Sequence, residues 1–204
     1  MKPESQGQAS FFYGADNSIQ EYTLVVLPSE YVNYKVMSER EIFYHNYEKA
    51  LPVKAKPNIS IANFFGRESM EETLFRWIQR VCSRQESFLL TLNNYGGFPP
   101  DTIYLRIQDP APLYSFIKAL KIIDDFLLSS LCPPLQSPGR LHLTLATRLP
   151  KEVYDKAIKE YAQKDFNESF MAAELVLLKK SHEMDSFKRV NVFAFSPAKQ
   201  SSYE

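Results

Sequence analysis

The sequence predicts a bilobal, duplicated α+β fold: two antiparallel-sheet lobes with helices outside and a central cleft. Two observations support this fold class. Strand-like and helix-like stretches follow the order strand, helix, strand, helix, hairpin, and then helix, strand, helix, hairpin. The stretches 56–62 and 140–146 also share one layout: base, any residue, polar residue, aliphatic, hydroxyl, aliphatic, alanine. Repeats longer than a solenoid unit of about 50 residues are typical of two similar lobes, whose motif strands we expect to face each other.

The first elements are predicted from apolar patterning. Residues 22–27 form a continuous aliphatic and β-branched run ended by Pro28, which is typical of a central strand buried on both faces. Residues 29–51 follow a loose helical period. After the strand at 56–62, Gly66 is expected to close the strand, and Ser69 with Glu72 matches a capping box that begins a helix. The buried stripe of that helix is predicted at Met70, Leu74, Trp77, Ile78 and Val81.

Two hairpins and two further helices complete the prediction. Strands at 87–92 and 102–107 are separated by residues 93–100, whose Asn, Gly and Pro content predicts a long hairpin connection. Asp109 and Pro110 cap a helix that reaches about residue 130, and Pro150 starts another. The second hairpin is predicted from strands at 170–178 and 190–195, joined by residues 179–187.

The domain organisation follows from this order. We expect a flexible leader at 1–20, a single bilobal domain at 21–195 and a polar tail at 196–204. Lobe one covers about 21–108 and lobe two about 109–195, and the pattern leaves open whether strands exchange between the lobes.

Composition excludes several classes of protein. Of 204 residues 45% are hydrophobic, which is the ordinary globular range. Lys+Arg and Asp+Glu number 24 each, so there is no net positive field for an extended, sequence-blind grip on a duplex. Cys82 and Cys132 match no zinc or disulfide spacing, which favours free thiols in a reducing compartment. No apolar run is long enough for a membrane span and no signal-peptide pattern opens the chain, so we expect a cytoplasmic monomer without membrane partners.

The polar residues of the two motif strands define the candidate site. Side chains alternate between the faces of a strand, so Ile59, Ile61, Leu141, Leu143 and Leu145 are predicted to point into the core. The opposite faces then line the cleft with cations, hydroxyls, an amide and an imidazole, donors that suit a phosphate. This polar set is Lys56, Asn58, Ser60, Arg140, His142 and Thr144.

These motifs resemble the 2H phosphoesterase superfamily, the 2′-5′ RNA ligase-like and cyclic phosphodiesterase proteins that carry two His-x-Ser/Thr motifs. The resemblance covers roughly residues 22–195, with Leu141-His142-Leu143-Thr144-Leu145-Ala146 as the second motif. In the first motif the family has histidine where this chain has Asn58. The resemblance implies a hydrolase that binds the phosphate of a nucleotide or RNA end, with Asn58, Ser60, His142 and Thr144 at the catalytic positions. Phosphate contacts are expected from Ser60, Thr144, Lys56 and Arg140.

Asn58 limits the expected chemistry. In the family, one imidazole takes a proton from water and the other gives a proton to the leaving ribose oxygen. An amide cannot titrate, and each general acid or base is worth about 10²–10⁴ in rate, so we expect weakened or altered turnover from a degenerate active site. The alternatives are a non-catalytic module that binds a nucleotide or RNA terminus, and an interaction scaffold without a ligand. His45 and His182 are expected on the surface. For His142, a purely structural role within the strand is the alternative to a catalytic role.

Three aromatic residues are candidates for stacking on a base at the mouth of the cleft. They are Tyr95, Phe98 and Tyr104. Core packing is the competing interpretation for each of them. No metal or cofactor is expected, and no Walker-type loop is present.

Overall fold

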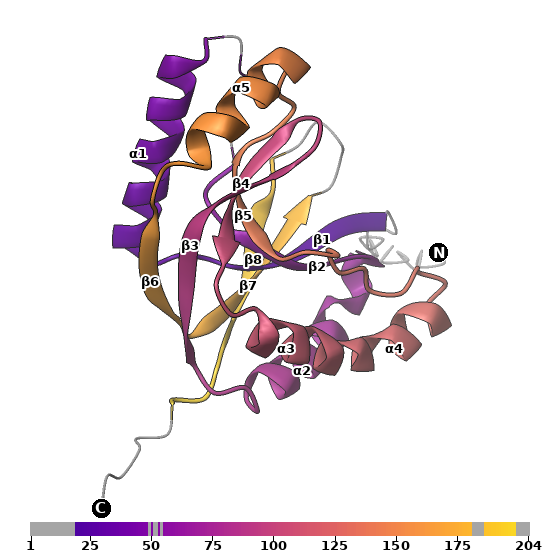
Figure 1. Cartoon of the computed structure of the whole chain (residues 1–204). Helices are drawn as coiled ribbons and strands as arrows, with labels where there is room; N and C mark the ends of the chain where they lie inside the picture. Colours follow the sequence, from indigo (N-terminus) through magenta and orange to yellow (C-terminus); the bar gives the residue numbers. More distant parts are fainter. Residues whose placement is uncertain (1–18, 49, 51–52, 54, 181–185, 199–204) are drawn as a thin grey trace, which may run out of the picture.

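A computed structural model of the chain describes residues 19–48, 50, 53, 55–180 and 186–198 (Figure 1). Eight strands form one antiparallel sheet in the order β6-β3-β4-β5-β2-β1-β7-β8. The strands are β1 Ile19–Val26, β2 Ile59–Arg67, β3 Phe88–Phe98, β4 Thr102–Ile107, β5 His142–Ala146, β6 Asn167–Ala172, β7 Glu174–Lys180 and β8 Lys188–Ala194. The helices are α1 Glu30–Asn46, α2 Glu71–Cys82, α3 Ala111–Leu120, α4 Asp124–Ser129 and α5 Lys151–Tyr161. The mixed helix and antiparallel-sheet fold confirms the predicted α+β class.

The sheet has two halves, β6-β3-β4-β5 and β2-β1-β7-β8, which meet where the motif strands β5 and β2 pair. β2 and β5 pair in register at Ile59 and Leu143 alone, whereas β2 pairs with β1 along its whole length. Figure 1 shows α1 and α5 together beside one half, and α2, α3 and α4 together beside the other. The helices α1 and α5 pack on β3–β6, and α2 and α3 pack on β8 and β2. The weakly paired junction of β2 and β5 therefore lies between two helix-backed half-sheets.

Strands from distant parts of the chain alternate between these halves. The hairpin β3–β4 pairs with β6 and β5, and the hairpin β7–β8 pairs with β1. The prediction of a single strand at 170–178 is wrong, because the chain breaks at Ala173 into β6 and β7. The two pieces join opposite halves of the sheet. The run is apolar except for Glu174 and both pieces are partly buried, so its composition does not predict a break.

One hydrophobic core runs through both halves and includes the inward faces of the motif strands. Ile59, Ile61, Leu143 and Leu145 are fully buried and Leu141 is nearly so, as the alternation predicts. Each such side chain contributes about 1.5–3 kcal/mol relative to an exposed position. Core packing therefore anchors the inward faces of the motif strands, and this fixes the direction of their polar faces.

The turn and cap predictions need three corrections. β2 continues through Gly66, which pairs with Gln20 of β1, and a 3₁₀ turn at Glu68–Met70 precedes α2, so Ser69 is not its N-cap. Residues 93–98 belong to β3 instead of a loop, because cross-strand pairing reaches Phe98 and Thr102. The helix after Asp109 starts at Ala111, and a 3₁₀ turn at Lys121–Ile123 divides it into α3 and α4.

No helix in the part of the chain that the structure describes is long and apolar enough to cross a membrane. Of the predicted leader at 1–20, residues 1–18 lie outside the described residues, and Ile19 and Gln20 belong to β1, so the predicted end of the leader is wrong. Of the predicted tail at 196–204, residues 199–204 lie outside the described residues.

Candidate active site

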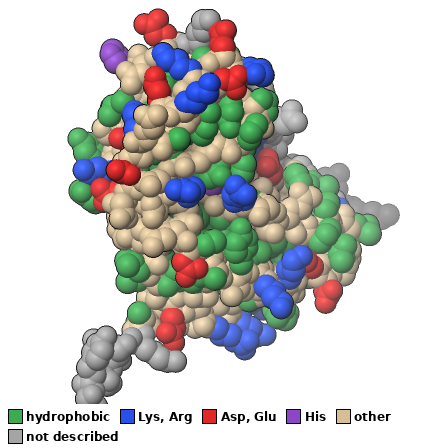
Figure 2. All heavy atoms as spheres, viewed as in Figure 1, with side chains coloured by type: hydrophobic (Ala, Val, Ile, Leu, Met, Phe, Trp, Pro, Cys, Tyr) green, Lys and Arg blue, Asp and Glu red, His purple; other side chains and the backbone are tan. Residues whose placement is uncertain are grey.

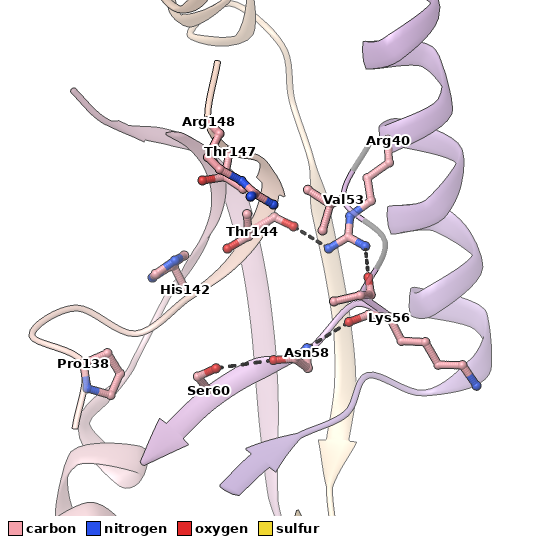
Figure 3. Close-up of a pocket in the computed structure, with 11 residues that line it drawn as sticks. Arg40, Val53, Lys56, Asn58, Ser60, Pro138, His142, Thr144, Thr147 and Arg148 are labelled. Atoms are coloured by element: carbon pink, nitrogen blue, oxygen red, sulfur yellow. Dashed lines mark hydrogen bonds between the residues drawn. The ribbon is translucent and has the colours of Figure 1, made fainter. Parts of the chain in front are cut away.

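A cavity of about 610 Å³ lies where β2, β5 and α1 come together (Figure 3). Its size falls within the range of small-molecule sites, about 300–1,000 Å³. The described residues that line it are Arg40, Val53, Ala55, Lys56, Asn58, Ser60, Pro138, His142, Thr144, Thr147 and Arg148. Five of the six polar motif residues predicted for the cleft are in this set, and Arg140 is not.

The register of the two motif strands places their polar residues in opposed pairs. Since Ile59 pairs with Leu143, antiparallel geometry sets Ser60 opposite His142 and Asn58 opposite Thr144. All four side chains are partly exposed on the same side of the sheet, while their neighbours along each strand are buried. The cavity floor therefore presents two hydroxyls, one imidazole and one amide.

A backbone hydrogen bond orients the His142 ring. Nδ1 lies 2.9 Å from the carbonyl oxygen of Arg140. A carbonyl only accepts, so Nδ1 carries the proton in this pair, and Nε2 of the neutral ring has the free lone pair. The rings of Phe98 and Tyr104 flank the imidazole, each 5.0 Å away between centroids. His142 is thus positioned to use Nε2 as a base or, once protonated, as an acid.

Asn58 makes the corresponding bond on the other strand. Its Nδ2 donates to the carbonyl oxygen of Lys56 at 2.8 Å, two residues earlier, as His142 does to Arg140. Its Oδ1 accepts a long hydrogen bond from the Ser60 hydroxyl at 3.5 Å. Asn58 therefore reproduces the anchoring half of a histidine and lacks the second ring nitrogen.

The cavity is locally positive in a chain of zero net charge. Arg40, Lys56 and Arg148 line it, and none of the described lining residues is Asp or Glu. Figure 2 shows a group of Lys and Arg side chains near the middle of one face of the molecule. Arg148 has a φ of 55°, in the left-handed region, which sets the chain direction directly after β5. Such a cavity suits an anion.

Arg40 is the main residue that our sequence interpretation missed. It is only 4% exposed, and its guanidinium donates to the carbonyl oxygens of Ala55 and Thr144, both at 2.7 Å (Figure 3). Burial lowers the pKa of this guanidinium, which nevertheless stays charged at neutral pH. One sequence signal could have identified Arg40: it falls on the buried stripe of α1 between Val36 and Phe43. Thr147, Arg148 and Pro138 were also missed, and they carry no comparable pattern.

A second cavity of about 680 Å³ adjoins the first, since Pro138 and His142 line both. Its other lining residues are Gly97, Phe98, Pro99, Gly139 and Arg140. The Phe98 ring stacks on Tyr104 at 4.3 Å, and the Arg140 guanidinium lies 5.6 Å from the Phe98 ring centre. Arg140 donates to the Tyr104 hydroxyl at 3.0 Å, and this bond raises the pKa of Arg140. Arg140 thus belongs with an aromatic surface beside His142.

The remaining candidate residues have mixed outcomes. Tyr95 is 7% exposed, donates to Glu39 of α1 and lines neither cavity, so the stacking role expected for it is wrong. Tyr104 is buried beneath Phe98. His45 is exposed on α1 as predicted, and His182 lies outside the described residues. No group of His, Cys, Asp and Glu suited to a metal ion occurs among the residues that the structure describes.

The two motif strands at the junction of a divided antiparallel sheet define a 2H phosphoesterase-type protein. The family model "2'-5' RNA ligase superfamily" matches residues 39–183, and the chain belongs to this family. E. coli LigT in complex with 3'-AMP superposes with a TM-score of 0.66 at 18% identity, covering 87% of this chain and 98% of LigT. TT0787 of Thermus thermophilus gives 0.66 at 14% identity, covering 88% and 100% of the two chains.

The PDE domain of MHV ns2 also superposes, with a TM-score of 0.54 at 13% identity, covering 79% of this chain and 99% of that domain. A comparison with curated proteins gave no significant match. At these identities the structural likeness shows the fold alone.

Proposed function

We propose that this protein binds the phosphate of a nucleotide or RNA end in the cavity between β2 and β5. There it acts on a phosphodiester or 2′,3′-cyclic phosphate, with turnover reduced by Asn58. The observation that carries the proposal is the opposition of His142 and Ser60 in a cavity with three cations and no acid among its described lining residues. Membership of the 2′-5′ RNA ligase superfamily and solved complexes of E. coli LigT with 3'-AMP, ATP and NADP+ support this ligand class.

The reaction would use His142 for one of two proton transfers. Water adds to the cyclic phosphorus, and the bond from phosphorus to one ribose oxygen breaks. His142 Nε2 removes the proton of the attacking water, and the Ser60 and Thr144 hydroxyls donate to the phosphate oxygens. The leaving ribose oxygen then takes its proton from solvent, because Asn58 offers no titratable group. Loss of a general acid predicts a rate about 10²–10⁴ below that of a two-histidine site.

The second cavity is proposed to hold the base or ribose next to that phosphate. Phe98 offers a ring face, and Arg140 offers a guanidinium beside it. Stacking on an aromatic side chain is worth about 1–3 kcal/mol per base. Tyr104 would support Phe98 from beneath without contacting the base.

A non-catalytic binding module on the same cleft is the second candidate function. The observation that favours it is the Asn58 amide, which is engaged with Lys56 and Ser60 and therefore stabilises the cleft without proton chemistry. We propose for either function that residues 21–195 act as one monomeric domain. The buried free thiols of Cys82 and Cys132 support a reducing, cytoplasmic compartment.

Hydrolysis of 2′,3′-cyclic nucleotides and of short RNAs ending in a cyclic phosphate tests these functions. Wild type is compared with His142→Gln and Asn58→His, and His45→Gln serves as the exposed-histidine control. We expect slow turnover in wild type, none above background in His142→Gln, and an increase of about 10²-fold in Asn58→His. Binding without wild-type turnover favours the module. Failure of every variant to bind any phosphate ligand overturns both functions.

A further inference from the structure

Arg40 is a buried cation without an opposite charge. Among the residues that the structure describes, its guanidinium donates hydrogen bonds to two backbone carbonyls and makes a long contact with Met37 Sδ. It makes no hydrogen bond to a carboxylate of these residues. Its Nε is buried and has no hydrogen-bond partner there. The same side chain lines the cavity that holds Ser60, His142 and Thr144. A charged group that is only 4% exposed thus points at a site built for anions.

Such a placement is unfavourable unless a ligand completes it. Two carbonyl oxygens satisfy two of the five N–H groups of a guanidinium and provide no net negative charge. Removing a cation from water without a paired anion carries a large desolvation penalty. An anionic ligand in the cavity would supply the missing charge, and its binding would be strengthened by the low dielectric around Arg40.

We propose that Arg40 makes the cleft selective for a terminal phosphate monoester over a phosphodiester. The inference rests on the proposed function: opening of a cyclic phosphate, which is a diester, yields a monoester, and Arg40 makes the same cavity hold that product form more tightly than the diester. A monoester carries between one and a half and two negative charges at neutral pH, whereas a diester carries one. Arg40, Lys56 and Arg148 line the cavity and none of its described lining residues is acidic, so each added negative charge on the ligand is favoured.

The position of Arg40 also explains how it acts on both motifs. It bonds Ala55, which precedes β2, and Thr144, which lies within β5. Since β2 and β5 share a single registered pair, this guanidinium is a second connection between them. The cation that attracts the ligand therefore also sets the spacing of the strands that carry the Ser60 and Thr144 hydroxyls.

Calorimetric titration with two adenosine ligands tests the selectivity. Adenosine 3′-monophosphate is compared with its 3′-methyl phosphodiester, which has the same nucleoside and one charge fewer. For wild type we expect the monoester to bind at least about tenfold more tightly. In Arg40→Met the ratio should fall below about threefold. Arg84→Met is the matched control, because Arg84 is exposed and lines neither cavity, so its removal should leave the ratio intact.

A second measurement does not depend on the folding of the variant. At equal ionic strength, inorganic phosphate should raise the melting temperature of wild type well above the effect of chloride. Equal affinity of wild type for the two adenosine ligands, or full selectivity in a folded Arg40→Met variant, overturns the inference. If selectivity is absent while His142-dependent turnover of cyclic phosphates is present, the proposed function stands and this inference fails. If no phosphate ligand binds, both fail.

Discussion

Asn58 and His142 hold the same place on opposed strands through the same bond to a carbonyl oxygen two residues earlier. The amide therefore preserves the local backbone while removing the nitrogen that would face the ligand. A substitution of this kind changes the chemistry of the site with little effect on its shape. For this reason the fold alone does not decide between turnover and binding, and the residues at these two positions do.

The hydroxyls of Ser60 and Thr144 provide a first prediction at this scale. Replacing either by alanine removes one of the proposed hydrogen bonds to a charged phosphate, worth about 1.5–3 kcal/mol, so affinity for adenosine 3′-monophosphate should fall about 10- to 100-fold. Isothermal titration calorimetry measures this loss of affinity. Thr91→Ala is the control, because Thr91 is bonded to Ser169 and lines neither cavity. Unchanged affinity in Ser60→Ala and Thr144→Ala would contradict the assigned phosphate contacts.

Cys82 provides a second prediction, on pH dependence. Burial raises the pKa of its thiol from 9.0 to about 12. In the unfolded chain the thiol ionises first, so its contribution to stability is complete below pH 9 and is lost as the pH rises towards 12. Between pH 9 and 10.5, urea unfolding should show wild type losing stability faster than Cys82→Ala by up to about 1.4 kcal/mol per pH unit. Parallel curves for the two proteins would show that this thiol is not shielded.

At the scale of elements, alternation and periodicity located most strands and helices, and long-range pairing decided the rest. The inward residues Ile59 and Leu143 were predictable because a strand places every second residue on one face. Residues 93–98 were not, because their Asn and Gly content is typical of turns, yet β4 and β6 pair with them. Asn94 accommodates this with a φ of 58° and with hydrogen bonds to the backbone of Phe166.

The site was predictable to a similar extent. Local spacing identified His142, Thr144, Asn58 and Ser60. Arg40 reaches Thr144 across 104 positions of sequence, and no local pattern encodes that contact.

Two glycines of the β3–β4 hairpin provide a third prediction. A Cβ at Gly96 would lie 2.7 Å from the Tyr104 ring, and one at Gly97 would lie 2.5 Å from the Tyr154 hydroxyl of α5. Gly97→Ala should therefore destabilise the fold by about 1–3 kcal/mol. Gly96→Ala should in addition weaken nucleotide binding, because Tyr104 supports Phe98 and His142.

Gly66→Ala is the control for both substitutions, since a Cβ there meets its nearest neighbour at 3.6 Å, an ordinary van der Waals distance, and Gly66 lines neither cavity. Urea unfolding and nucleotide titration measure the two effects. If all three variants match wild type in stability, the close packing of β3 on β4 and α5 is incorrect.

At the scale of the whole molecule, the core is continuous across the junction of the half-sheets. Buried side chains of β1, β2 and β7 and those of β3, β4 and β5 belong to one cluster. The motif strands β2 and β5 contribute to its centre. The two halves should therefore unfold together in spite of their weak backbone pairing.

Calorimetry checks this fourth prediction. We expect one thermal transition, with equal calorimetric and van't Hoff enthalpies. A ligand at 100 times its dissociation constant should shift the transition as a whole, by about 2.7 kcal/mol of stability. Phe193→Ala, in the edge strand β8, should lower the same midpoint at a cost of about 3–5 kcal/mol without splitting the transition. Two separate transitions would show that the half-sheets are independent.

The place of β1 in the sheet has a consequence for the synthesis of the protein on the ribosome. β1 lies between β2 and β7, and β7 begins only at Glu174. At translation rates of about 5–20 residues per second, the roughly 150 residues between them take about 8–30 s to add. During that interval the nascent chain exposes one unpaired edge of an apolar strand, a template for association with other chains. We therefore expect nascent-chain chaperones to bind this edge of β1 until β7 has emerged.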